Sequence, residues 1–153
     1  MRNPWATKCR QAAATETPIA LGENESTLYG FNEIVRQRAG DVLQPSITKV
    51  GGISEFKKIA ALAQAANLPI APHSFYFGPG LAATLHVAAT FGGPLPVEFP
   101  TGDQETPFLA RPIQARDGWL EVPKGPGLGV ELNPEALRRH PFDKNAAQPF
   151  VLR

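Results

Sequence analysis

The sequence predicts an α/β protein: a partial (β/α) barrel of four β/α units with an irregular carboxyl-terminal segment. Four short apolar runs recur along residues 17–100, and a helix-length stretch separates each run from the next. Each run ends in a polar residue, spaced by 23, 27 and 25 positions: Glu23, Ser46, His73 and Glu98. This spacing is typical of parallel strands that alternate with helices. Because a closed eight-stranded barrel needs roughly 250 residues, four units make about half of one.

The first unit consists of a strand at about residues 18–22 and a helix at about 28–38. Apolar residues fall at helical spacing in that helix, and charged residues take its other face. The apolar residues are Leu28, Phe31, Ile34 and Val35. The second unit begins with a strand at about 42–48, and a pair of glycines then turns the chain into a helix at about 55–66.

The third strand is expected at about residues 68–72, followed by an Ala-rich helix at about 81–90. The fourth strand is expected at about 95–99, after a Gly-Gly-Pro sequence that ends the helix. Prolines and glycines become frequent in residues 101–153, where only about 134–140 favours a helix. We therefore divide the chain into an irregular segment at 1–16, a half barrel at 17–100 and a Pro/Gly-rich segment with one short helix.

Composition excludes several classes of function. The 15 basic and 14 acidic residues leave a net charge of +1, which indicates no nucleic-acid or membrane partner. A single cysteine excludes an internal disulfide framework. No apolar run approaches the roughly 20 residues needed to span a bilayer, and no secretory signal is recognisable. A cytoplasmic chain is the expectation.

The polar residues that end the runs predict a site. The carboxyl ends of parallel strands meet at one edge of a sheet, so these side chains are expected to converge. Glu23 offers carboxylate oxygens to a hard divalent cation, and His73 is a candidate general base. Taken singly, each residue is more often structural than catalytic. We interpret the two remaining histidines, His86 and His140, as structural.

Five stretches of the sequence resemble the enolase superfamily, in its mandelate racemase/muconate lactonizing branch. They are Pro-Ile-Ala-Leu-Gly-Glu-Asn-Glu at 18–25, Gln-Pro-Ser-Ile-Thr-Lys-Val-Gly-Gly-Ile at 44–53, Ala-Pro-His-Ser at 71–74, Val-Glu-Phe at 97–99, and the tail at 117–130. The resemblance covers about residues 17–140 and leaves out residues 1–16.

The resemblance implies a fold, a cofactor and a reaction. In that family a capping domain precedes a modified (β/α)7β barrel, and three acidic residues hold Mg2+. A base removes the proton α to a substrate carboxylate. Glu23 would be the metal ligand on the fifth strand, His73 the base on the seventh, and Glu98 the acid near the substrate carboxylate. The implied enzyme is a sugar-acid dehydratase or a racemase/epimerase (a lyase or an isomerase).

The sequence departs from the family pattern at Ser46, where the racemase-type pattern has an aspartate that pairs with the histidine. A serine offers only a neutral hydrogen bond, which puts the histidine–aspartate pair in doubt. Lys49 falls where related groups carry a catalytic lysine. We keep two interpretations of Lys49: a catalytic base, or an ionic partner of nearby carboxylates.

The resemblance places the other Mg2+ ligands and the capping domain upstream of residue 1. We therefore expect a carboxyl-terminal barrel fragment that is inactive alone and binds Mg2+ weakly or not at all. Its partners would be a small carboxylate substrate, together with a second copy of the chain or a missing amino-terminal half. Two alternatives stay open: a catalytically dead remnant, or a non-enzymatic interaction module that keeps the half-barrel scaffold.

Overall fold

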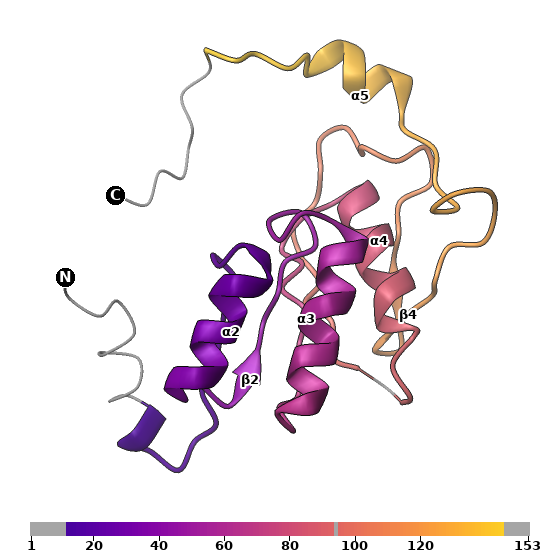
Figure 1. Ribbon diagram of the computed structural model, residues 1–153. Helices are drawn as coiled ribbons and strands as arrows, with labels where there is room; N and C mark the ends of the chain where they lie inside the picture. The colour runs from indigo at the N-terminus through magenta and orange to yellow at the C-terminus, as the bar shows by residue number, and fades with distance from the viewer. Residues whose placement is uncertain (1–11, 94, 146–153) are drawn as a thin grey trace.

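The computed structural model describes residues 12–93 and 95–145 (Figure 1). Most of the segment predicted to be irregular, at residues 1–16, lies outside this range. The elements in chain order are β1 (Ala20–Leu21), α2 (Thr27–Gln37), β2 (Val42–Leu43), α3 (Ile53–Ala65), α4 (Pro79–Ala88), β3 (Ala115–Arg116), β4 (Trp119–Leu120) and α5 (Pro134–Arg139).

The first three apolar runs lie parallel to one another, as predicted. β1 pairs with β2 in parallel, with Ala20 opposite Val42. Two isolated parallel bridges then join the second run to the third, Leu43 to Ile70 and Ser46 to His73. The chain returns through α2 and α3 between these runs. The carboxyl ends of all three runs therefore meet at one edge.

The fourth run does not form the predicted strand at 95–99. Pro96 and Pro100 have no backbone N–H, so the run cannot supply the alternating donors of a regular ladder. The run nevertheless lies beside the third. The backbone N–H of Ser74 donates to Glu98 Oε2 over 3.2 Å, and the Ser74 hydroxyl donates to the Glu98 carbonyl. The prediction is wrong about secondary structure and right about the neighbour.

Three helices pack side by side against the parallel runs (Figure 1), α2 against α3 and α3 against α4. The core between them consists of fully buried apolar side chains, including Phe31, Ile34, Leu43, Phe56 and Ile59. All four predicted helices are confirmed to within two residues at each end. Burial of this apolar stripe fixes which face of each helix points to the strands, and so fixes the positions of the strand ends.

A carboxylate from α3 holds the start of α2. Ser26, the N-cap residue of α2, makes no side-chain capping bond, and Glu55 Oε1 instead accepts the backbone N–H of Leu28 over 3.0 Å. Lys58 donates to the other Glu55 oxygen over 3.0 Å. The bond from Leu28 and then the bond from Lys58 hold the pKa of Glu55 below its usual value. This contact fixes the first unit to the second.

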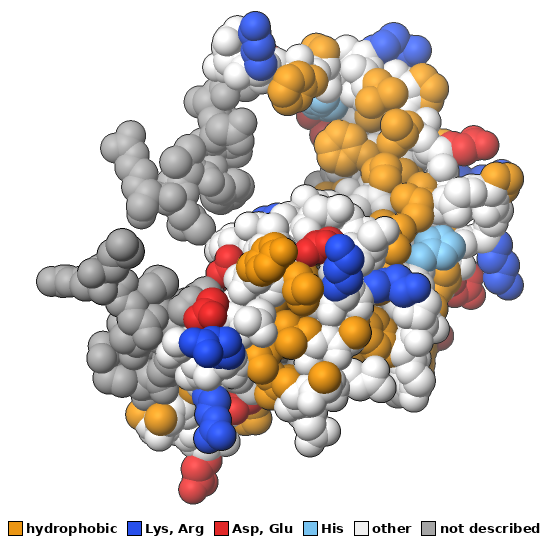
Figure 2. Space-filling model, viewed as in Figure 1, with side chains coloured by type: hydrophobic (Ala, Val, Ile, Leu, Met, Phe, Trp, Pro, Cys, Tyr) orange, Lys and Arg blue, Asp and Glu red, His pale blue; other side chains and the backbone are white. Residues whose placement is uncertain are grey.

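The carboxyl-terminal segment contains a hairpin where no strands were predicted. β3 and β4 pair antiparallel across a two-residue turn at Asp117 and Gly118, with φ of 50° and 80°. Both values suit a type I′ turn, for which Asp-Gly is a preferred sequence. Large apolar side chains stay exposed further along the segment, including Leu132, Leu137 and Phe142, and Figure 2 shows orange side chains gathered around α5.

No helix in the described part of the chain is long and apolar enough to cross a membrane.

Candidate functional site

His73 and Glu98 lie in hydrogen-bond contact at the carboxyl ends of the third and fourth runs. His73 Nδ1 lies 2.6 Å from Glu98 Oε2. The same carboxylate oxygen accepts the backbone N–H of Ser74, so the glutamate is anchored to the main chain next to the histidine. The histidine side chain is 18% exposed and the glutamate side chain 40% exposed. An imidazole with a carboxylate on one nitrogen is an arrangement suited to proton transfer.

The backbone of His73 is also held from the helix side. The hydroxyl of Tyr76 donates to the His73 carbonyl over 3.2 Å and lies 2.9 Å from the hydroxyl of Thr84 in α4. The Tyr76 ring meets the imidazole edge to face, with centroids 6.4 Å apart. Tyr76 was not among the residues predicted for the site. Its place three residues after the candidate base is the only signal of this role in the sequence.

Ser46 is joined to His73 by a parallel backbone bridge, and its side chain makes no hydrogen bond to the imidazole. Its side chain is fully buried, and its Oγ lies 3.2 Å from Thr48 Oγ1. The backbone N–H of His73 donates to the Pro45 carbonyl over 3.2 Å, which fixes the register of the two runs. The residue that replaces the expected aspartate is therefore a neighbour of His73 through the backbone only.

Glu23 and Lys49 belong to a second group, joined through Asn24. The amide of Asn24 donates to Glu23 Oε1 over 3.2 Å, and Lys49 Nζ donates to Asn24 Oδ1 over 2.9 Å. The structure shows no direct ion pair between Glu23 and Lys49. No hydrogen bond or ion pair among the described residues joins this group to the His73–Glu98 pair. The sequence predicted that these four site residues lie at the same edge. In the structure His73 and Glu98 contact each other directly, whereas Glu23 and Lys49 are linked only through Asn24.

Mg2+ does not fit the described residues of this chain taken alone. Within them, no three histidine, cysteine, aspartate or glutamate side chains lie close enough together to hold a metal ion. Glu23 offers a single carboxylate, and the positively charged ammonium of Lys49 binds the same asparagine, Asn24, that contacts this carboxylate. Mg2+ demands near-octahedral oxygen coordination and gives up water reluctantly, so one carboxylate is a poor site for it.

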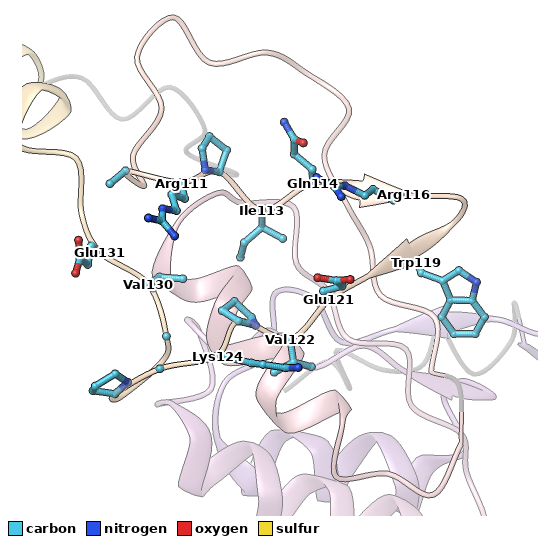
Figure 3. Close-up of a pocket in the computed structure, with 16 residues that line it drawn as sticks. Arg111, Ile113, Gln114, Arg116, Trp119, Glu121, Val122, Lys124, Val130 and Glu131 are labelled. Carbon is cyan, nitrogen blue, oxygen red and sulfur yellow. The ribbon is translucent and has the colours of Figure 1, made fainter.

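His86 and a cavity of the carboxyl-terminal segment lie away from the predicted site residues. His86 Nε2 lies 3.1 Å from the Leu128 carbonyl, which ties α4 to the tail and agrees with a structural role. A cavity of about 900 Å3 lies within residues 110–131, and Figure 3 shows Arg111, Glu121 and Lys124 among the residues around it. None of the predicted site residues lines this cavity.

The fold consists of parallel β/α units, and a histidine and two carboxylates lie at the carboxyl ends of its strands. These features define an α/β protein whose polar groups occupy the edge where barrel enzymes carry out chemistry. Residues 4–136 match a family model described as enolase C-terminal domain-like. The chain belongs to the enolase superfamily, in its mandelate racemase/muconate lactonizing branch. The matched range includes most of the segment 1–16 that the resemblance had left out.

The relatives include dehydratases and cycloisomerases of sugar acids. Arabinonate dehydratase of Saccharolobus solfataricus is 37% identical over 124 residues, which cover 80% of this chain and 33% of that protein. The 3,6-anhydro-D-galactonate cycloisomerase of Zobellia galactanivorans is 33% identical, with a TM-score of 0.79 over 89% of this chain and 39% of that one. L-talarate dehydratase of Polaromonas sp. JS666, solved with Mg and L-glucarate, is 32% identical, with a TM-score of 0.73 over 88% and 36%. The chain spans about a third of the length of the curated relatives it matches.

Proposed function

We propose that this chain supplies the proton-transfer part of an active site that acts on sugar acids, in a reaction of the dehydratase or racemase/epimerase type. The observation that carries the proposal is the imidazole of His73, placed at the edge of the parallel runs with a carboxylate 2.6 Å away. Relatives that act on arabinonate, xylonate and galactonate support the substrate class. In this proposal the chain contributes the last four units of a barrel.

The chemistry begins at the carbon next to the substrate carboxylate. His73 takes the α-proton, so the C–H bond breaks, an N–H bond forms, and the electron pair moves into the carboxylate. In a dehydratase the protonated imidazole then returns that proton to the leaving β-hydroxyl group, which departs as water. In a racemase a second group protonates the opposite face. Lys49, on the neighbouring run, is our candidate for that group.

Glu23 is proposed as one ligand of Mg2+. The other ligands must come from residues beyond those described, because no three candidate ligands lie together among the described residues. The Asn24 amide would hold the Glu23 carboxylate in place at the end of the first run. Stabilising the charge that develops on the substrate is the largest requirement of this reaction, and a single carboxylate does not meet it.

The test is proton exchange measured by NMR in D2O with millimolar Mg2+ and a hybrid protein, in which this chain replaces the matching third of arabinonate dehydratase and that enzyme supplies the remaining Mg2+ ligands. The substrate panel is arabinonate, xylonate, galactonate and glucarate. We expect loss of the C2 proton signal, or formation of a 2-keto-3-deoxy acid, from at least one of them. His73→Asn should lower the rate by about 10²- to 10⁴-fold, the usual contribution of a general base. His140→Asn is the matched control, because that histidine is exposed and distant in sequence.

Absence of exchange and of product across the whole panel would contradict the proposal. It would favour one of the two alternatives, a catalytically dead remnant or an interaction module. Exchange that survives His73→Asn at the full rate would remove His73 from the mechanism and leave the substrate class standing.

A further inference from the structure

The carboxylate beside the candidate base comes from an unexpected place in the fold. The family pattern puts the partner of the histidine at position 46, one run before His73, and this chain has a serine there. The Ser46 hydroxyl is engaged with Thr48 and lies in a fully buried position. The partner that the structure gives to His73 lies one run after it, at Glu98.

Glu98 is itself held in one place, as a positioning group must be. Its Oε2 receives both His73 Nδ1 and the backbone N–H of Ser74. Its backbone carbonyl accepts the hydroxyl of Ser74, a side chain that is fully buried. Backbone and side chain of Glu98 are thus both fixed to the residue that follows the histidine. Its Oε1 has no hydrogen-bond partner among the described residues.

The backbone of His73 is fixed from the opposite side. Tyr76 has one hydroxyl proton, and the His73 carbonyl can only accept, so Tyr76 donates to it. The Thr84 hydroxyl can then donate to Tyr76 or to the Gly80 carbonyl, which is 3.0 Å away. With its backbone tied to α4 and Nδ1 tied to Glu98, the imidazole has one orientation available.

We propose that Glu98 is the positioning carboxylate of His73 and takes the place of the aspartate that position 46 lacks. A carboxylate can only accept, so the neutral imidazole carries its proton on Nδ1, and the lone pair on Nε2 is free. Nε2 is then the atom that takes the substrate proton, and the Glu98 charge stabilises the imidazolium that results. This last step rests on the proposed function, whereas the assignment of the ring proton does not.

The experiment is ¹⁵N NMR of the histidine rings in the purified chain, recorded without substrate in alkaline buffer. Ring nitrogens that carry a proton and those that do not have well separated shifts. His73→Asn assigns the His73 signals among those of the three histidines. We expect a protonated Nδ1 and an unprotonated Nε2 for His73. Glu98→Ala should shift the ring toward the Nε2–H form that free imidazole side chains prefer in water.

Two further variants sharpen this test. Glu98→Gln should preserve the Nδ1–H form, because the amide oxygen can still accept the proton. Glu105→Ala is the matched control, a glutamate paired with Arg139 elsewhere in the chain, and should leave the His73 signals unchanged. A wild-type His73 with its proton on Nε2 would overturn the proposal without any variant. An unchanged Nδ1–H signal in Glu98→Ala would overturn it as well.

The ring-proton measurement tests the Glu98 assignment and the exchange assay tests the proposed function, so either claim can be refuted while the other stands. An Nδ1–H ring in a protein that turns over no sugar acid would sustain the Glu98 assignment and remove the proposed function. Turnover by a protein whose His73 is protonated on Nε2 would do the opposite.

Discussion

At the scale of single residues, the site depends on how tightly the ring and the backbone of His73 are held in position. Its ring is held by Glu98 and its carbonyl by Tyr76, and these two contacts come from different parts of the fold. Of the two contacts, the one from Tyr76 contributes more directly to the stability of the fold, because its hydroxyl connects the third run to Thr84, a buried residue of α4. Holding the base in one geometry is what proton transfer to a fixed substrate requires.

We expect Tyr76→Phe to lower the free energy of unfolding by about 0.5–1.5 kcal/mol, the usual value of one hydrogen bond. Urea denaturation at neutral pH measures this directly. Tyr29→Phe is the matched control, because Tyr29 is 81% exposed and its hydroxyl has no hydrogen-bond partner among the described residues. Equal stability of the two variants would show that the Tyr76 bridge contributes nothing.

The sequence predicted which residues lie at the strand ends and not which of them touch. Spacing alone places His73 and Glu98 at one edge, since period fixes the ends of parallel runs. The contact between them depends on side-chain direction at Glu98, which follows a proline-containing segment with no regular strand geometry. The Asn24 link between Glu23 and Lys49 escaped prediction for a similar reason, because a loop amide carries no periodic signal.

At the scale of elements, the junction of α2 and α3 carries a charge that titrates in acid. The folded-state pKa of Glu55 lies below its ordinary value of 4.5, because the carboxylate accepts the Leu28 N–H and a Lys58 hydrogen bond. A lowered folded-state pKa stabilises the fold above that value, and the contribution disappears as the pH falls through the folded-state pKa. The α2 start should therefore loosen in acid.

We expect the melting temperature of Glu55→Gln to fall less steeply than that of the wild type as the pH drops below 4.5. The glutamine keeps an oxygen that can accept the Leu28 N–H, but it has no carboxyl group whose protonation could change the stability of the fold. Calorimetric melts over an acidic pH series measure the two slopes. Glu33→Gln serves as control, because its ion pair with Arg36 lies on the exposed surface of α2. Parallel slopes for Glu55→Gln and the wild type would refute the assignment.

The helices were predictable and the short strands less so. Helical spacing of apolar residues is repeated over three or more turns in α2 and α3, which makes the pattern strong. β3 and β4 have two residues each and offered no alternation to count. The Asp117–Gly118 pair was the available signal for a hairpin turn. It was hard to recognise, because prolines and glycines that favour turns are frequent throughout this segment.

At the scale of the whole molecule, α5 is fastened to the rest of the chain by a few polar contacts. Asn133 donates through its amide to the Pro107 carbonyl over 2.9 Å, and its backbone N–H donates to Phe108. Arg139 binds Thr106 over 2.8 Å and pairs with Glu105. Ala136 is the buried residue of the helix. Contacts of this kind are individually weak, so α5 should open more readily than the helices of the core.

We expect Arg139→Ala to increase hydrogen exchange of the α5 amides by up to roughly fivefold, the equivalent of ~1 kcal/mol. Mass spectrometry of peptides that span residues 134–139 measures this. Arg138→Ala is the adjacent control, because that side chain has no hydrogen bond or ion pair with any described residue. Matching exchange in both variants would mean that Asn133 and the buried alanine hold α5 without help from Arg139.

The proline-rich fourth run has a consequence for the behaviour of the protein at high concentration. Exposed strands associate with strands of other molecules when they present alternating N–H donors and carbonyl acceptors, and this is a common route to aggregation. Residues 95–100 lie beside the third run, and Pro96 and Pro100 offer no donors there. A run that has two prolines and no regular strand geometry is therefore a poor template for a neighbouring chain.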